Sequence, residues 1–415
     1  MGNDMVAATK LASANQTTLF ALNHHAPSSV QASLVLRPGQ THEPGEYSML
    51  RQLRLPEGRH AATVLALQAA ERWGYEYGVN EHRVTLGYTS WETRFPNQTT
   101  TFHGSDLVRL MLERGQSAHA AIETAIDLLS RYGERESSEG NIFLVADPQE
   151  SFLLETCGRH WALLECGQTR VVTDAAMIRQ DWSRLAPGLA SDLIEKGQWE
   201  DDGSKLDFAR CLGGTQGNRT LRAQRRWGRA SLAMAQQHGA IDLHFLRRML
   251  ADHYTANRNL LQPAKETRLA STFLVDLQSK DTPLLAWHAF GKPKVALYFP
   301  ICLVGELPDA FRADADESIQ KCTAELRRQA RGSEGIKVVH AMERLQAKFD
   351  QDADDFLIRT HTRRHGDNYP IVSCATEMMD HHVAMFRSEC DHLVGVPARK
   401  TRFVPVEEEE VLYFA

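Results

Sequence analysis

Adjacent histidines are the first side chains in this sequence whose type could carry chemistry. The two pairs are His24-His25 and His381-His382, and His42 and His392 lie within reach of the same segments of chain. Such clusters can ligate zinc, but the spacing here matches no strong zinc pattern. Histidines at the surface or in the core are the better interpretation, so we expect no metal and no cofactor.

Other nucleophilic and charged groups give weaker signals. Ser271 and Thr272 offer hydroxyls at the start of a predicted strand, but no base is identifiable near them in the sequence, which disfavours a serine nucleophile. Arg219, Arg222, Arg226 and Arg229 fall on one face of a predicted helix. A solvated face is the default interpretation of such a stripe, and an anionic ligand is the minority one.

Composition describes an ordinary globular protein. The chain has 415 residues, of which 42% are hydrophobic and 24% charged, and its net charge is −6. This charge argues against general nucleic-acid binding, which needs a concentrated basic surface. No apolar run approaches the ~20 residues of a membrane span, and no signal peptide is visible. The seven cysteines are scattered and unpaired in spacing, which favours reduced thiols and a cytoplasmic location.

The beginning of the chain predicts a β-hairpin. Met5 to Ala8 and Thr17 to Leu22 are short apolar runs rich in strand formers, separated by turn-prone residues. A chain end that lies within a sheet is informative, because termini usually fray.

The following segments predict layers of sheets and helices. Apolar residues recur at helical spacing in Ser105 to Arg114 and in Ser117 to Tyr132, and short strands follow from Asn141 to Thr173. Tyr47 to Leu55 is predicted as one strand. Strands, then helices, then strands again indicate an α/β protein of packed layers.

The composition changes near Pro308, beyond which the pattern is polar and helical. We therefore predict two parts: a layered domain over residues 1–305, and a mainly helical C-terminal extension over residues 306–415 that packs on it. The acidic run Glu407 to Glu410 near the end of the sequence is interpreted as solvated.

Five segments in this order resemble the secernin and cysteine dipeptidase family of N-terminal nucleophile hydrolases. The second segment corresponds to that family's Gly-x-Asn-Glu-His-Gly-Val turn, and the others correspond to its hairpin, its first two helices and its paired strands. The segments are Val6 to Asn23, Gly78 to Val84, Gly104 to Arg114, Asp127 to Gly133 and Phe152 to Ala162. The resemblance implies a four-layer αββα sandwich and hydrolysis of C–N amide bonds, in which the first side chain attacks and its own amine is the base.

The resemblance also identifies site positions, most of which have changed here. The family's nucleophilic cysteine falls at Gly2, which has no side chain to form an acyl intermediate. Asn23 agrees with the family, whereas His25 stands where an aspartate would orient the amine. An asparagine near the reacting centre is replaced by Asp174, whose carboxylate would repel an oxyanion. Asn80 matches the family's oxyanion donor.

A distal arginine completes the family's site. Arg222, Arg225 and Arg226 are all compatible with that position, and the sequence does not choose among them. Without the resemblance, Asn23 and Asn80 would be interpreted as turn residues that satisfy local backbone groups.

The sequence therefore predicts a secernin-like protein whose amide chemistry is lost or altered and which binds a small peptide-like or acyl-amino ligand. Two alternatives stay open. The first is a working dipeptidase or amidohydrolase with an unrecognised nucleophile, and the second is a non-catalytic interaction protein. The oligomeric state is left open.

Overall fold

The computed structural model describes most of the chain. The described residues are 2–27, 29–51, 53–70, 72–94, 102–133, 139–214, 218–251, 268–278, 281–291, 296–315, 318–330, 335–363 and 370–394. The acidic run near residue 407 lies outside them.

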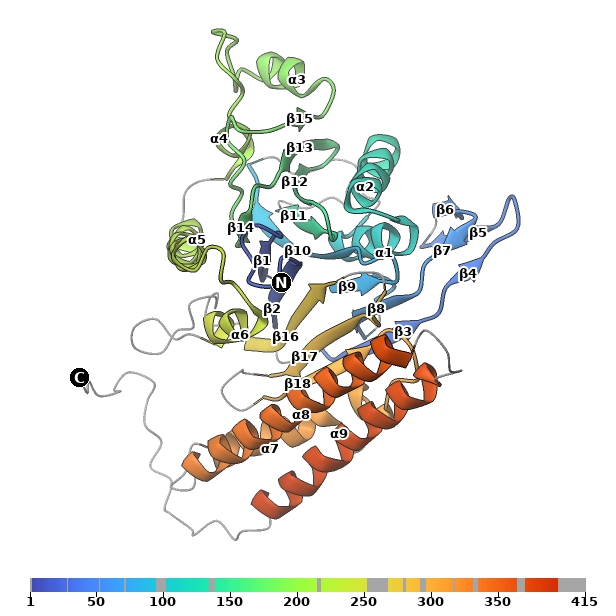
Figure 1. The fold of residues 1–415 in the computed structure, drawn as a ribbon. Coiled ribbons are helices and arrows are strands. Elements are labelled where there is room, and N and C mark those ends of the chain that lie inside the picture. Colours follow the sequence, from blue (N-terminus) through green and yellow to red (C-terminus); the bar gives the residue numbers. More distant parts are fainter. Residues whose placement is uncertain are drawn as a thin grey trace, which may run out of the picture.

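Two sheets form the centre of the molecule (Figure 1). The first sheet has the order β14 (Thr169–Val172), β1 (Gly2–Ala8), β2 (Thr18–Ala26), β16 (Arg268–Leu277), β17 (Leu285–Phe290) and β18 (Tyr298–Cys302). The second has the order β15 (Arg184–Leu185), β13 (His160–Glu165), β12 (Ser151–Cys157), β11 (Glu139–Ala146), β10 (Thr85–Glu92), β9 (Tyr77–Asn80), β8 (Val64–Ala69) and β3 (Ala32–Arg37).

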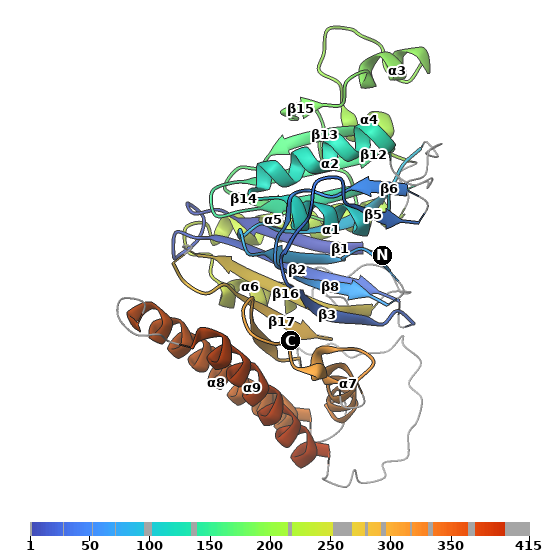
Figure 2. The same ribbon diagram turned by 90° about the vertical axis from the view of Figure 1, so that its right-hand side faces the viewer.

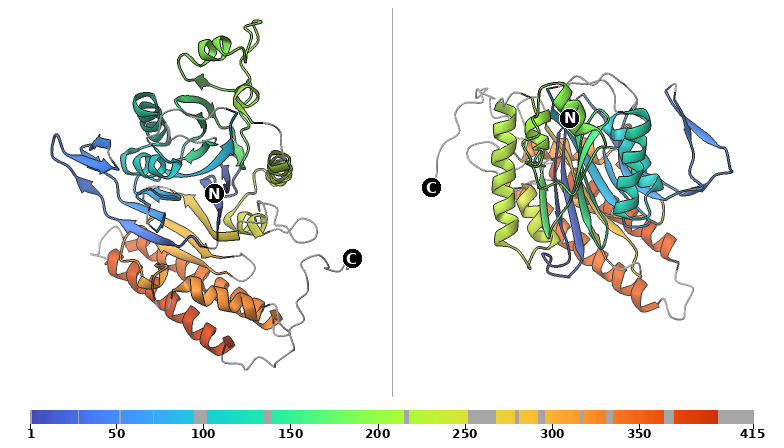
Figure 3. Two further views of the ribbon diagram at one scale, coloured as in Figure 1. Left: turned by 180° about the vertical axis from the view of Figure 1, so that it is seen from behind. Right: turned by 90° about the horizontal axis from the view of Figure 1, so that it is seen from above.

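Helices cover the outer face of each sheet. Helices α5 (Asn218–Gln236) and α6 (Leu243–Ala251) pack on the first sheet, while α1 (Gly104–Arg114) and α2 (Ala118–Tyr132) pack on the second. Viewed from above, the four layers appear in succession (Figure 3). Short helices α3 (Leu189–Glu195) and α4 (Phe208–Leu212) follow β15. The predicted α/β class with an αββα arrangement is confirmed.

The predicted hairpin is also confirmed. Strands β1 and β2 pair antiparallel, and β1 lies inside the sheet between β14 and β2. Met5 and Ala7 face the core between the sheets, whereas Val6 and Ala8 face the helices. Because both faces of β1 are buried, its second half, Met5 to Ala8, is a continuous apolar run rather than an alternating one.

Gly87 on β10 packs closely against side chains of the hairpin. A Cβ atom there would lie 2.4 Å from Leu22 Cδ1 and 3.1 Å from Met5 Sδ. A side chain at this position would therefore require Leu22 of the hairpin to move.

The segment from Tyr47 to Leu55 corrects a prediction. It forms two short strands, β5 (Tyr47–Leu50) and β6 (Leu53–Pro56), rather than one. Arg51 has φ of 56°, a left-handed conformation that reverses the chain and that a sequence rarely reveals without glycine or asparagine. Together with β4 (Gln40–Thr41) and β7 (His60–Ala61), these strands extend away from the sandwich (Figure 1).

Three helices follow the sandwich: α7 (Ile319–Gln329), α8 (Gly335–Arg363) and α9 (Ile371–Val394). They lie against the end of the first sheet, after the 3-10 turn η1 (Asp309–Phe311) (Figure 2). Helices α8 and α9 contact β18, the last strand of that sheet, and so cover an edge that would otherwise be open to pairing. No helix within the described ranges is long and apolar enough to cross a membrane.

Glu155 on β12 gives a first testable prediction. Its side chain is fully buried and accepts hydrogen bonds from the backbone N–H groups of Met177, at 2.6 Å, and Ile178, at 3.1 Å. Burial raises the pKa of Glu155 to about 8, whereas an exposed glutamate titrates near ~4.3. The unfolded chain therefore loses this proton first, and the free energy of unfolding falls by about 1.4 kcal/mol per pH unit from roughly pH 4 to 8.

We expect Glu155→Gln to remove most of that pH dependence. Urea unfolding of both proteins at pH 5 and pH 8 measures it. If the free energy of unfolding changes equally with pH in the two proteins, Glu155 is ionised throughout this range.

Candidate functional site

Gly2 lies in β1, where its backbone pairs with His25 of β2. Positions two residues apart on a strand face the same side, so position 2 and Asp4 share the face that carries helix α5. Met5 pairs with Val172 on the other neighbour, β14. Continuing that register brings Asp174 beside the segment from Gly2 to Asp4.

Four charged or ionisable side chains converge on this face, and we call them the ion cluster: Asp4, His25, Asp174 and Arg226. Arg226 on α5 donates to Asp174 and also lies 3.4 Å from Asp4 Oδ1. His25 Nε2 lies 3.5 Å from Asp4 Oδ2. All four are buried, with exposed fractions of 8% or less. A single guanidinium thus bridges two carboxylates in the interior.

The charges in the ion cluster stabilise one another. Burial alone would raise the pKa of Asp4, but the positive charge of Arg226 and the contact with His25 outweigh it and hold that pKa below its usual value. Burial likewise opposes the charge on Arg226, whereas Asp4 and Asp174 raise the pKa of its guanidinium. Asp4 and Arg226 are therefore both ionised at neutral pH.

The structure brings together only some of the residues that the sequence singled out. Gly2, His25 and Asp174 meet at the ion cluster, and of the three candidate arginines it is Arg226 that joins them. Arg222 and Arg225 are exposed on α5.

Asn23 is buried on the same strand as His25, but its amide is used elsewhere. Its Nδ2 donates to the Leu250 carbonyl of α6 at 3.0 Å, and its Oδ1 accepts from Thr272 Oγ1 at 2.9 Å. These bonds tie β2 to α6 and β16.

Asn80 lies apart from the ion cluster. Its Nδ2 donates to the carbonyls of Leu112 and Gly115 at the end of α1, and its Oδ1 accepts from Val84 N–H. Next to Gly2, the contact between β1 and β10 is made instead by Thr89 of β10, whose hydroxyl accepts a hydrogen bond from Asn3 N–H at 3.0 Å. Thr89 is five residues along β10 from Val84, or roughly 17 Å. In this structure the Asn80 amide holds a turn against α1.

A cavity of about 330 Å³ opens beside Asp174. We call it the Asp174 cavity. Its lining includes Glu92, Arg94, Arg179 and Arg210, from the end of β10, the segment after β14, and α4. The lining is therefore mainly polar and rich in guanidinium groups.

Some of the charged side chains that line the Asp174 cavity already form ion pairs. Others have no carboxylate partner among the described residues. Arg179 Nε bonds Asp207 Oδ2 at 2.6 Å, and Asp174 pairs with Arg226. Arg94 Nε donates to the Gly213 carbonyl at 2.8 Å and its Nη2 to the Arg210 carbonyl at 3.3 Å, and no carboxylate that the structure describes pairs with this guanidinium. A ligand with a carboxylate would complement this lining better than a cationic one.

Asp4 is the cluster member that sequence reasoning missed. It is the one carboxylate on a β1 face that otherwise carries Val6 and Ala8, which is the only sequence signal for it. Within the described ranges, no group of three or more histidine, cysteine or carboxylate side chains is placed to hold a metal ion.

No family model matches the chain. Among solved structures, it is similar to a mutant of the conjugated bile acid hydrolase from Clostridium perfringens (11% identity, 73% of this chain and 92% of that chain covered, TM-score 0.39). It is also similar to the penicillin V acylase from Agrobacterium tumefaciens (12% identity, 76% of this chain and 88% of that chain covered, TM-score 0.39). A third similar structure is the Caenorhabditis elegans N-acylethanolamine-hydrolyzing acid amidase ortholog (9% identity, 65% of this chain and 91% of that chain covered, TM-score 0.33). Likenesses this loose establish no family for this chain.

Proposed function

We propose that this chain is a secernin-like protein of the N-terminal nucleophile hydrolase architecture that has lost cleavage through residue 2. In this proposal it binds a small, anionic, peptide-like or acyl-amino ligand in the Asp174 cavity. The observation that carries the proposal is the ion cluster. The position assigned to the nucleophile is a glycine, and the groups beside it are engaged in a buried ion network.

The ion cluster supports loss of amide cleavage for two physical reasons. A glycine cannot form a covalent acyl intermediate. In this proposal Asp174 stands at the position of an asparagine near the reacting centre, where a carboxylate would repel a developing oxyanion, and Arg226 is already shared between two carboxylates. Arg94 and Arg210 at the cavity remain available to recognise a carboxylate.

Calorimetric titration tests the proposal, with N-acetyl-leucine and N-acetyl-alanyl-alanine as probes and with their C-terminal amides as uncharged controls. We expect saturable binding of the acids, weaker binding of the amides, and no hydrolysis of any of them. Arg210→Ala should weaken binding about tenfold, because it removes one charge-assisted hydrogen bond.

Arg222→Ala is the matched control, since Arg222 is exposed on α5 and is not part of the cavity lining. Hydrolysis of either probe would favour the working amidohydrolase, provided that Arg210→Ala reduces it. Neither binding nor hydrolysis would leave the interaction protein as the better interpretation.

A further inference from the structure

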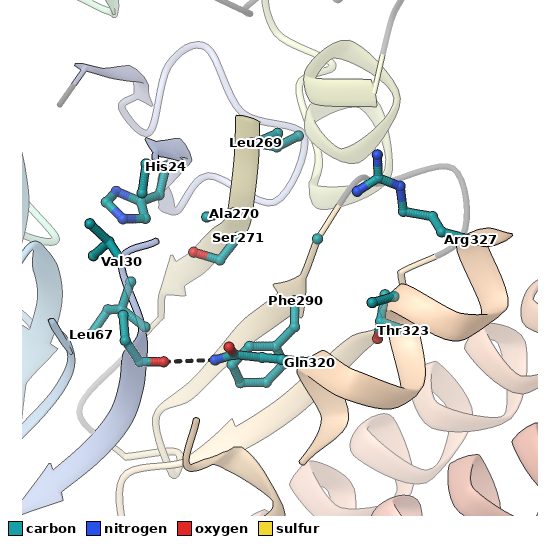
Figure 4. A pocket seen from close by; sticks show the side chains of 14 residues that line it. His24, Val30, Leu67, Leu269, Ala270, Ser271, Phe290, Gln320, Thr323 and Arg327 are labelled. Carbon is teal, nitrogen blue, oxygen red and sulfur yellow. Dashed lines mark hydrogen bonds between the residues drawn. The ribbon is translucent and has the colours of Figure 1, made fainter. Parts of the chain in front are cut away.

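The opposite face of the same hairpin holds a second group of polar residues. Asn3, His24 and Ser271 occupy directly neighbouring positions on β1, β2 and β16. All three are buried, and Ser271 and His24 line a cavity of about 90 Å³ between the first sheet, β3, β8 and helix α7 (Figure 4). This cavity is separate from the ion cluster, because it lies on the other side of the sheet.

His24 is held in one tautomer. Asn3 Nδ2 donates to the Tyr88 carbonyl at 2.6 Å, so Asn3 Oδ1 is the atom that faces His24 Nδ1, at 2.8 Å. An amide oxygen can only accept, so His24 Nδ1 carries the proton and Nε2 carries the lone pair. Burial lowers the pKa of His24 to about 3, which keeps the ring neutral at physiological pH.

Ser271 is linked to a second histidine through a tyrosine. Its Oγ lies 2.8 Å from the Tyr77 hydroxyl, which lies 2.8 Å from His288 Nε2. The other His288 nitrogen, Nδ1, is buried and has no hydrogen-bond partner in the described part of the chain, and burial lowers the pKa of His288 to about 3. A buried lone pair without a partner costs less than a buried N–H group, so Nε2 carries the proton and donates to Tyr77.

The direction of the hydrogen bonds from His288 through Tyr77 to Ser271 decides whether the Ser271 hydroxyl can donate its proton elsewhere. With His288 donating to Tyr77, the Tyr77 hydroxyl donates to Ser271 Oγ. The proton of Ser271 is then free to be donated toward the cavity. His24 on β2 is the direct cross-strand neighbour of Ser271, and the Cβ atoms of such a pair lie about 5 Å apart.

The backbone also singles out this position. The register of β16 against β2 shifts between Leu269 and Ser271, which places a β-bulge at Ala270. Bulges re-aim the following side chain and recur beside active sites. The apolar part of the lining comes from Leu269 on the same strand, Phe290 beside Ser271 on β17 and Leu67 of β8, and Arg327 of α7 lies at the far side of the cavity (Figure 4).

We propose that Ser271, His24 and Asn3 form a serine hydrolase site for small esters with short acyl groups. In the first step Ser271 Oγ attacks the ester carbonyl carbon and its proton passes to His24 Nε2. The C–O bond to the alcohol then breaks, and His24 returns the proton to the departing oxygen. Water attacks the acyl-serine in the same way, with His24 again as base, and releases the carboxylic acid and Ser271. Asn3 is a positioning residue that fixes the His24 tautomer.

The test uses the full chain and p-nitrophenyl acetate. We expect release of p-nitrophenol and, on rapid acid quench, one acetyl group on the peptide that contains Ser271. Ser271→Ala should abolish both signals. His24→Gln should slow acetylation at least 100-fold while thermal unfolding stays near that of the wild type. Thr272→Ala is the matched control, because Thr272 is the next hydroxyl on β16 but faces the α6 layer.

A second measurement covers the case in which Ser271→Ala does not fold. Ser271→Cys should be alkylated by iodoacetamide faster than the buried Cys302, and His24→Gln should remove that advantage. Acetylation elsewhere in the wild type, or none, overturns the proposal. So does acetylation of Ser271 at a rate that His24→Gln leaves unchanged. Loss of ligand binding at the Asp174 cavity has no bearing on these outcomes.

Discussion

Replacing Arg226 by methionine should destabilise the protein by about 3–5 kcal/mol. Arg226 is the cation that neutralises two buried carboxylates, Asp4 and Asp174. A methionine of similar length keeps the packing of α5 against the first sheet but leaves two like charges in the interior. Removal of one partner from a buried ion pair has this magnitude, because the remaining charge has lost its compensation. Urea unfolding at pH 7 measures the change.

The pH dependence of this effect identifies its cause. The pKa of Asp4 is lowered in the folded wild type, so the stabilisation it provides is present above about pH 4 and is lost as the pH falls through the folded value. In Arg226→Met burial raises that pKa instead. Asp4 then takes up a proton in mild acid, and the difference between variant and wild type should shrink from pH 7 to pH 4.

Asp174→Asn is the matched control for the ion cluster. It removes one carboxylate and leaves Arg226 paired with Asp4, so a loss below about 1.5 kcal/mol is expected. An Arg226→Met variant as stable as the wild type at pH 7 would show that the two carboxylates do not need this guanidinium.

Phe299→Ala should cost about 3–5 kcal/mol. Phe299 on β18 is buried, and its ring contacts Phe311 of η1, Phe349 of α8 and Phe386 of α9, with ring centroids 5.3–5.5 Å apart. Truncation leaves a cavity where the sheet meets the C-terminal helices, and buried phenylalanines removed in this way cost this much. Val372→Ala on α9, a position that is 59% exposed, is the control and should change stability by less than about 0.5 kcal/mol.

The same variant tests how the C-terminal helices relate to the sandwich. One core cluster contains residues of both β1 and α8, Met5 and Phe349 among them. We therefore expect hydrogen-exchange protection to fall in β1 and α8 together. Loss of protection in α8 alone would mean that residues 306–415 unfold as a separate unit, with a boundary near residue 305.

The sequence determined the elements whose patterns are local. The hairpin follows from two apolar runs around a turn, and α1 and α2 follow from apolar residues at helical spacing; both are observed. The absence of a nucleophilic side chain at residue 2 is likewise a property of the sequence alone. The turn at Arg51 could not be predicted from the sequence, because no glycine marks the position of its left-handed backbone.

Tertiary structure decided which polar groups meet. Arg222, Arg225 and Arg226 could not be ranked, because they differ only in which one α5 turns toward Asp174, and that depends on packing of the helix against β14. Asn80 matched a motif, yet its amide bonds two carbonyls at the end of α1, more than 30 positions away.

The contacts of Ser271 make the same point for the second cavity. No base near Ser271 could be identified from the sequence, because His24 comes from β2 and Tyr77 and His288 from two further strands. Local periodicity fixes strands and helices because neighbouring residues share a face. Pairing across strands depends on register and on layer packing, and these exist only once the whole chain has folded.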